Sequence, residues 1–160
     1  KNCGYVKDST TIHAYQAYTV NGKTVYGYYD RSAGAEILSL TNAYRRSNGR
    51  SSLSDNPGWQ EYADIRAREQ ALDYSHTRPN GEKWYTLLPN VLRAENLAES
   101  KTTNPTGIMA AWKNSSGHNA NLLNQDFNRL AVGCFHVMVF TGGSKIPSET
   151  VYWVQLFSRQ

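Results

Sequence analysis

Cysteine is scarce in this sequence, which contains only Cys3 and Cys134 among its 160 residues. Two thiols cannot by themselves form a four-cysteine zinc site. In an oxidising compartment they could pair and tie the N-terminal segment to the core. Closing so long a loop would contribute about 4 kcal/mol in the chain-entropy model. The alternative is two free thiols, with Cys134 buried in a strand. We favour the disulfide.

Long apolar runs are also missing. No stretch approaches the roughly 18 consecutive apolar residues of a membrane-spanning helix, so we expect a soluble chain without a transmembrane segment. The hydrophobic content of 39% and the aromatic content of 12% exclude a wholly disordered chain. The length fits one domain with a sizeable core.

Concentrated basic charge is absent as well. The net charge is +4, from 17 basic and 13 acidic residues. The basic residues are scattered, whereas a nucleic-acid-binding surface usually concentrates them. We therefore expect no nucleic-acid partner, although the charge is compatible with mild attraction to anionic cell walls or lipid surfaces. The sequence also lacks internal repeats and the Gly-x-Ser-x-Gly pattern of many serine hydrolases.

The N-terminal 31 residues are rich in tyrosine, with six of the eleven in the chain. Asn21-Gly22 is typical of a two-residue hairpin turn, because both positions need positive φ. It predicts strands at about 14–20 and 23–29. This hairpin is either an extra edge of the domain sheet or a small appendage. We expect its tyrosines to pack on the protein itself rather than on a partner.

Apolar residues with helical spacing recur three times after this segment. They predict helices over 33–47, from 57 to about 74, and from about 105 to 115. Ser32 is the expected cap of the first helix, and the Asp55-Asn56-Pro57 run starts the second. The second helix would place His76 at its C-terminal end, where the helix dipole favours a protonated imidazole.

Two strands are expected near the C-terminus, at 130–140 and 150–157. Both alternating faces of the first are largely apolar, which is typical of a central strand covered on both sides. We expect His136 to be a strand residue whose hydrogen bonds are satisfied by its neighbours. A short helix or turn is predicted at 119–123, directly after His118.

Four motifs then occur in an order that points to a family. They are Leu40-Thr41-Asn42-Ala43-Tyr44-Arg45, Ser75-His76-Thr77-Arg78-Pro79-Asn80-Gly81, Ala94-Glu95-Asn96-Leu97-Ala98 and the run from Ala111 to Leu123. With the strand Tyr152-Trp153-Val154-Gln155-Leu156-Phe157, this pattern resembles the CAP superfamily, which includes cysteine-rich secretory proteins, antigen 5, pathogenesis-related proteins and sperm-coating-protein-like domains. The resemblance is strongest to its bacterial branch.

The resemblance covers about residues 33–160 and implies an α+β fold. The expected architecture is an α-β-α sandwich with a three- to four-stranded antiparallel sheet flanked by helices, plus the N-terminal β-hairpin arm. We divide the chain into an extension, residues 1–31, and a CAP domain, residues 32–160. The family also implies an extracellular or cell-surface location, and we expect a monomer.

The resemblance further implies a site. His76 and His118 match the two histidines of the family, and Glu95 matches one of its two glutamates. The second glutamate is expected just after Trp112, but Lys113, Asn114 and Ser115 stand there. We expect a polar cleft formed by His76, Glu95, His118, Asn96 and Ser115.

The chemistry of such a cleft leaves alternatives open. Two imidazoles can bind zinc or another divalent metal, and Glu95 is the candidate catalytic base or the acceptor that orients one ring. A serine such as Ser115 or Ser116 beside His118 could act as a nucleophile. Alternatively, Glu95 and the histidines only pin loops and helix ends together, and we expect Trp112 to be a core residue.

We therefore predict a binding or interaction module whose ligand is an unidentified protein, lipid or cell-wall component. The alternative is a metal-dependent, protease-like hydrolase that uses the same cleft. Whether the protein is an enzyme stays open, because the second glutamate is missing and catalytic zinc usually has three protein ligands.

Overall fold

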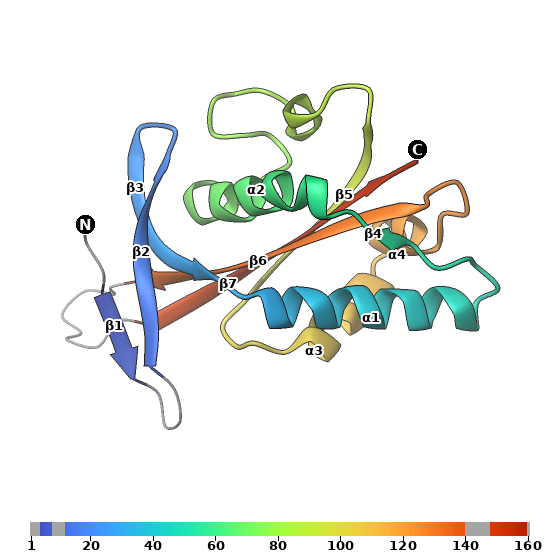
Figure 1. The fold of residues 1–160 in the computed structure, drawn as a ribbon, viewed down its shortest axis with the longest axis horizontal. Coiled ribbons are helices and arrows are strands. Elements are labelled where there is room, and N and C mark those ends of the chain that lie inside the picture. The colour runs from blue at the N-terminus through green and yellow to red at the C-terminus, as the bar shows by residue number, and fades with distance from the viewer. Residues whose placement is uncertain (1–3, 8–11, 140–147, 160) are drawn as a thin grey trace.

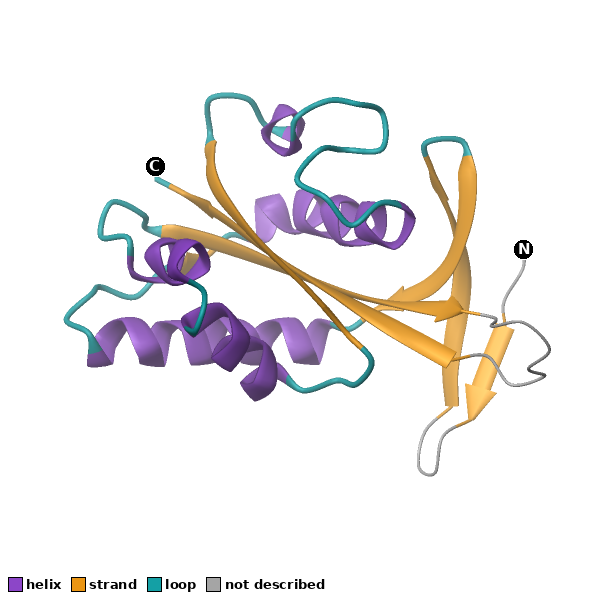
Figure 2. Cartoon of the chain, turned by 180° about the vertical axis from the view of Figure 1, so that it is seen from behind, coloured by secondary structure: helices purple, strands orange, loops and turns teal. Residues whose placement is uncertain are grey.

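A computed structural model describes residues 4–7, 12–139 and 148–159 of the chain. The fold is α+β, with a twisted sheet crossing the middle of the molecule and helices on both of its faces (Figures 1 and 2). This confirms the predicted fold class. Within the described residues, no helix is both long enough and apolar enough to cross a membrane.

The sheet has seven strands in the described residues, in the order β1-β2-β3-β6-β7-β5, with the short β4 pairing in parallel with β6. Their bounds are β1 Gly4–Lys7, β2 Ile12–Val20, β3 Lys23–Tyr29, β4 Ser54–Asp55, β5 Leu92–Ser100, β6 Arg129–Val139 and β7 Ser148–Ser158.

The prediction of a three- to four-stranded sheet was wrong, because the N-terminal hairpin joins the domain sheet. Strand β3 pairs antiparallel with β6 from Gly27 opposite Val137 to Tyr29 opposite Phe135. A Cβ atom on Gly27 would lie 2.2 Å from the His136 carbonyl oxygen, so glycine permits this close approach. The hairpin is therefore an extra edge of the sheet.

The predicted hairpin itself is confirmed. Strands β2 and β3 pair up to Val20 opposite Lys23, and Asn21 and Gly22 form the turn between them. Their φ angles are 48° and 76°, the left-handed values that a tight hairpin turn requires.

Helix α1 spans Arg31–Ser47, two residues longer at its start than predicted. Its cap is Asp30 rather than Ser32, because the backbone of Asp30 is still extended and its Oδ1 accepts a hydrogen bond from Ala33 N at 2.9 Å. The chain thus passes from β3 into α1 through a single residue.

Helix α2 spans Gln60–Leu72 after a 3₁₀ turn, η1, at Pro57–Trp59. It ends earlier than predicted, since the backbone of Asp73 is extended. Gln70 then holds the following loop by accepting a hydrogen bond from Ser75 N at 2.9 Å. His76 therefore lies in a loop and not at a helix end, so the helix dipole does not act on it as predicted.

The remaining helices lie between the second motif and the C-terminal strands. A 3₁₀ turn, η2, spans Trp84–Leu87, and α3 spans Pro105–Lys113. Helix α4 spans Ser116–Leu123, so it begins earlier than predicted and includes His118. The motif around Glu95 lies in the strand β5, at the edge of the sheet.

The core has two parts, one on each face of the sheet. Helices α1 and α3 pack on one face, where Val132 and Cys134 point, and α2 packs on the other, where Ala131 and Phe135 point. Strand β6 is thus buried on both sides, as predicted. Gly133 lets α2 approach, because a Cβ atom there would lie 2.4 Å from the Ala63 carbonyl oxygen.

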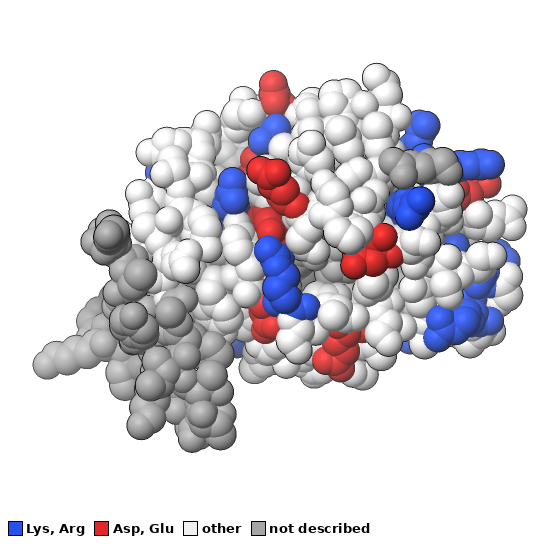
Figure 3. Space-filling view, in the orientation of Figure 1, with Lys and Arg blue, Asp and Glu red and all other residues white. Residues whose placement is uncertain are grey.

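Charges of both signs are interspersed on the face seen in Figure 3. No broad area of that face carries one sign alone, apart from a small group of basic side chains over the C-terminal end of α1. This distribution agrees with the scattered basic residues of the sequence.

Candidate functional site

Glu95 lies at the centre of the site and points toward α2. Its side chain is fully buried and is bound by Arg66 of α2, whose Nε donates to Oε2 at 2.6 Å and whose Nη2 donates to Oε1 at 3.0 Å. Arg66 is also fully buried. Such a two-pronged ion pair fixes both the position and the charge of the carboxylate.

The ion pair continues into a chain of charges. Arg66 Nη1 donates to Glu69 at 2.8 Å, and Arg78 binds the other oxygen of Glu69 at 2.9 Å. Burial lowers the pKa of Arg66, but its two carboxylate partners outweigh this effect and raise it overall. Arg66 also donates to the Ser75 carbonyl at 2.8 Å, so the network holds the loop that carries His76.

His76 is oriented by the same carboxylate. Its Nδ1 lies 2.9 Å from Glu95 Oε1, while 56% of its side chain is exposed. Its Nε2 has no protein hydrogen-bond partner among the described residues. A carboxylate on one ring nitrogen and an open second nitrogen is the arrangement of many metal-binding histidines.

Asn96 points to the opposite face of β5 from Glu95 and holds the other histidine segment. Its Nδ2 donates to the His118 carbonyl at 3.2 Å and to Gln155 Oε1 at 3.1 Å. Its Oδ1 accepts a hydrogen bond from Asn121 of α4 at 2.9 Å. Neighbouring residues of a strand face opposite ways. Glu95 therefore holds the segment of His76 on one face of the edge strand, and Asn96 holds the segment of His118 on the other.

His118 is half-buried in α4, and its imidazole has no hydrogen-bond partner in the described part of the chain. Burial lowers its pKa, and the positive charge of His76 lowers it further. The two imidazoles are thus close enough to interact electrostatically. A lowered pKa keeps His118 neutral near pH 7, as metal ligation requires.

Few protein ligands for a metal are available around His76, Glu95 and His118. Across residues 4–7, 12–139 and 148–159, no three potential ligand atoms of His76, Glu95 and His118 lie within 4.8 Å of one another. Since Glu95 is held by Arg66, the two imidazoles are the available protein ligands. Two imidazole donors are fewer than the three or four protein ligands that zinc usually has.

The other predicted site residues have structural roles. Ser115 is the N-cap residue of α4, and its carbonyl accepts a hydrogen bond from Asn119 N at 2.8 Å. No hydrogen bond joins the Ser115 hydroxyl to His118 within the described residues, so a nucleophile–base pair is not formed there. Trp112 is a core residue, as predicted, and donates to the Leu97 carbonyl at 2.9 Å.

The region that carries the second glutamate in the family is cationic here. Lys113 Nζ lies 4.4 Å from the centre of the Tyr44 ring, a cation–π contact. The Tyr44 hydroxyl in turn donates to Asn119 at 2.7 Å. These two contacts connect α1 to α3 and α4 at the place where the family pattern has its second carboxylate.

Cys134 carries a free, buried thiol. Cys3 lies outside the described residues, and the predicted disulfide between them stays a prediction.

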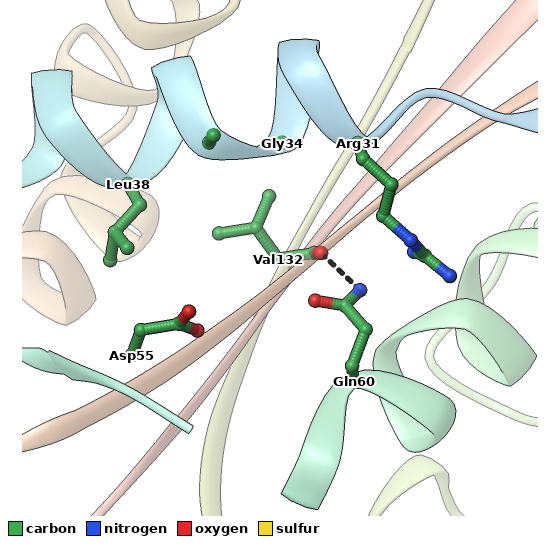
Figure 4. A pocket seen from close by; sticks show the side chains of 7 residues that line it. Arg31, Gly34, Leu38, Asp55, Gln60 and Val132 are labelled. Atoms are coloured by element: carbon green, nitrogen blue, oxygen red, sulfur yellow. Dashed lines mark hydrogen bonds between the residues drawn. The ribbon is translucent and has the colours of Figure 1, made fainter. Parts of the chain in front are cut away.

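Two hollows open on the surface. The first, of about 200 Å³, lies between the start of α1, β4, the start of α2 and β6. In Figure 4 Arg31 and Asp55 border it, and Gln60 donates to the Val132 carbonyl at 2.8 Å. It contains no residue of the predicted cleft, so we do not assign the main function to it.

The second hollow, of about 500 Å³, adjoins the motif residues. Ala94 precedes Glu95 in β5, and Asn121 lies one helical turn after His118 in α4. Two arginines, Arg93 and Arg159, also line this hollow.

Comparison with known proteins agrees with this arrangement. Residues 38–157 match the family model described as "CAP: Cysteine-rich secretory protein family". The chain belongs to this CAP family. The matched segment includes all five residues of the predicted cleft.

A bacterial relative of this CAP chain is known. It is 28% identical over 107 residues to the uncharacterized protein YkwD of Bacillus subtilis, covering 61% of this chain and 40% of YkwD. The chain thus spans less than half the length of that relative.

Solved structures share the fold. An extracellular Bacillus anthracis protein containing an SCP domain superposes with a TM-score of 0.61 at 19% identity, over 82% of this chain and 41% of that one. An outer surface protein of Borrelia burgdorferi gives a TM-score of 0.59 at 16% identity, over 84% of this chain and 99% of that one.

Sequence analysis missed the basic partner of the site. Arg66 follows the helical spacing of the apolar residues Ala63 and Ala67, and this was the available signal. A charged residue within an apolar stripe is buried only when it is paired. That pattern could have directed the search for a buried carboxylate toward Glu95.

Proposed function

We propose that this CAP domain is an extracellular or surface-attached binding module rather than a hydrolase. The observation that carries the proposal is the bidentate ion pair between Arg66 and Glu95, because it occupies the one carboxylate that could act as a general base. A general base must be free to reach the proton it removes. Here two hydrogen bonds from Arg66 and one with His76 hold the Glu95 carboxylate in place and occupy three of its about four lone-pair positions.

The role of Glu95 is then to orient His76. With Nδ1 bound to the carboxylate, Nε2 of the half-exposed His76 is left for another partner. In this proposal that nitrogen and the His118 imidazole together hold a divalent metal such as zinc. A metal bound there supplies a Lewis acid with open coordination positions. Those positions suit an oxygen donor from a ligand, which makes the metal a recognition element.

The neighbouring hollow supports recognition of an anionic ligand. Its two arginines, Arg93 and Arg159, and the side chains of Asn121 and Asn124 offer donors suited to carboxylate or phosphate oxygens. Asp126 also lines the hollow, 3.9 Å from Arg159, so the cationic character of the hollow rests mainly on Arg93. The net charge of +4 favours approach to the anionic polymers of a cell wall. The extracellular Bacillus anthracis protein and the Borrelia burgdorferi outer surface protein, which share the fold, support this location.

The alternative, a metal-dependent hydrolase, uses the same residues. It needs Glu95 to leave Arg66 and act on metal-bound water. The absence of the second family glutamate counts against it, because Lys113, Asn114 and Ser115 stand where that residue is expected. Turnover of a peptide or ester library by the zinc-loaded protein would overturn the binding-module proposal.

Calorimetric zinc titration tests the metal part of the proposal. It is best performed in a background with both Cys134→Ala and His136→Gln, which removes two members of the separate Asp30, Cys134 and His136 group. We expect binding that is lost in His76→Ala and in His118→Ala. In Glu95→Gln it should weaken 10- to 100-fold, a magnitude typical of losing the carboxylate that orients a metal-binding imidazole. Unchanged zinc binding in the two histidine variants would contradict the proposal.

A further inference from the structure

A second group of potential metal ligands lies away from the histidine pair. Asp30, Cys134 and His136 each offer one ligand atom, and these three atoms lie within 4.8 Å of one another. Asp30 is the single residue between β3 and α1, whereas Cys134 and His136 point to the same face of β6. The cluster therefore joins the end of the hairpin to the centre of the domain sheet.

The hydrogen bonds of His136 already have the pattern of a metal-binding imidazole. Its side chain is 2% exposed, with Nδ1 at 3.0 Å from Glu149 Oε2 and Nε2 at 2.9 Å from Asp30 Oδ2. The Tyr28 ring stacks on the imidazole with 4.3 Å between the ring centres. Glu149 accepts a further hydrogen bond from Tyr15 of β2, so the carboxylate behind Nδ1 is itself held in place.

We propose that Asp30, Cys134 and His136 form a structural zinc site that fastens the N-terminal hairpin to the CAP domain. Asp30 Oδ2, Cys134 Sγ and His136 Nε2 are the ligands. Glu149 is the supporting carboxylate on the second imidazole nitrogen. A mixed nitrogen, sulfur and oxygen set suits zinc, a borderline-soft ion that accepts all three donor types.

The spacing of the donor atoms agrees with this ion. Zinc bond lengths to nitrogen, sulfur and oxygen imply donor separations of about 3.4–3.6 Å at a tetrahedral centre. In the cluster Nε2 and Oδ2 are 2.9 Å apart, and the three donor atoms all lie within 4.8 Å of one another. The imidazole and the carboxylate must therefore move slightly apart to seat the ion.

Zinc binding would exchange two protons for one divalent cation, so the charge balances. The metal ion takes the position of the proton between His136 Nε2 and Asp30 Oδ2, and it also displaces the thiol proton of Cys134. The Nδ1 proton stays on the imidazole and is donated to Glu149. Asp30 keeps its other oxygen on Ala33 N as the helix cap. The Asp30 side chain is 21% exposed, so solvent reaches this edge of the cluster.

This site is separate from the histidine pair of the proposed function. His136 is paired with Val151 of β7, whereas Glu95 is paired with Leu156, five residues further along the same strand. The side chains also lie on opposite faces of the sheet, since Cys134 packs toward α1 and Glu95 toward α2. Either site can therefore be present without the other.

Cobalt(II) distinguishes the two sites, because only one contains sulfur. Reduced Cys3→Ser protein is titrated with Co²⁺, and the substitution removes the competing thiol. We expect one equivalent of cobalt to produce a thiolate-to-cobalt charge-transfer band together with the visible bands of a tetrahedral ion. Zinc should then abolish these bands stoichiometrically and raise the melting temperature by several degrees.

Four variants in the Cys3→Ser background define the ligands. Cys134→Ala should abolish the charge-transfer band, and His136→Gln should weaken cobalt binding at least tenfold. Asp30→Asn should also weaken binding at least tenfold while keeping α1 capped, because asparagine caps helices as well as aspartate does. His76→Ala combined with His118→Ala should leave the band unchanged. Circular dichroism of each variant establishes that it is folded.

Three outcomes would overturn the proposal. One is the absence of the band in folded Cys3→Ser protein, and another is its persistence in Cys134→Ala. The third is a Cys3–Cys134 disulfide in the wild-type protein secreted into an oxidising medium, because the sulfur would then be consumed. Mass spectrometry of unreduced peptides detects that disulfide directly.

Discussion

Arg66 and Glu95 meet as a fully buried pair, with Nε 2.6 Å from Oε2 and Nη2 3.0 Å from Oε1. Taking both charges out of water is costly unless each stays paired. The pair therefore ties α2 to the edge strand β5. It also explains why the carboxylate at the centre of the motif supports His76 instead of acting as a free base.

Removing one member of this pair should be strongly destabilising. We expect Arg66→Met to lower the free energy of unfolding by about 3–5 kcal/mol, because Glu95 stays buried without its ion-pair partner. Glu95→Gln should cost less, because Arg66 keeps Glu69 as a partner. In the double variant part of the loss should be recovered. Urea denaturation measures all three. The exposed pair of Arg159 with Asp126, at 3.9 Å, is the control, and Arg159→Met should change stability by less than about 0.5 kcal/mol.

Asn96 should affect metal binding without being a ligand. Asn96→Leu removes its hydrogen bonds to the His118 carbonyl and to Gln155, and we expect a loss of about 1–3 kcal/mol because these partners are buried. Zinc affinity at the histidine pair should fall as α4 loosens. Hydrogen exchange of α4 amides and zinc calorimetry check both effects. Exposed Asn114→Ala is the control, and equal zinc affinity in Asn96→Leu would contradict the positioning role.

Gly133 should tolerate no side chain. Gly133→Ala places a Cβ atom 2.4 Å from the Ala63 carbonyl oxygen, so α2 must shift from β6. Overpacking of this kind typically costs about 1–3 kcal/mol. Gly117→Ala is the matched control, since nothing lies within 4 Å of its added Cβ and alanine favours a helix by up to about 1 kcal/mol. Thermal unfolding of the two variants should shift in opposite directions.

The metal-free protein should lose stability as pH rises above neutrality because of His136. Burial lowers its pKa, but hydrogen bonds to Asp30 and Glu149 together outweigh burial and raise it. Since the folded-state pKa exceeds the unfolded value of about 6.5, the contribution is fully present below about pH 6.5 and is lost as pH rises through the folded pKa. Urea denaturation in a chelator at several pH values measures this. A His136→Gln variant with the same slope would contradict the assignment.

Local sequence patterns predicted much of the fold. Asn21-Gly22 identified the hairpin turn, and apolar spacing located the helices, because both signals act over a few residues. The predicted ends of the helices were less accurate. Asp30 rather than Ser32 caps α1, since the cap depends on where the preceding strand stops pairing, and this is a long-range property.

The predicted cleft stays a prediction. The motifs selected His76, Glu95 and His118, and the structure brings their segments together around the edge of the sheet. The sequence analysis did not select Arg66 as the partner of Glu95, because the two residues meet only when α2 packs on β5. It also treated His136 as an ordinary strand residue, although Asp30 and Glu149 reach it from other elements.

The sequence by itself therefore determined the family and most of the local elements, and it selected His76, Glu95 and His118 as candidate site residues. Tertiary structure alone decided that the hairpin joins the sheet, that Arg66 neutralises Glu95 and that Asp30 meets Cys134 and His136. The physical reason is that propensities and turns depend on neighbours along the chain. Charge pairing, burial and ligand clustering depend instead on which distant segments the packed sheet brings into contact.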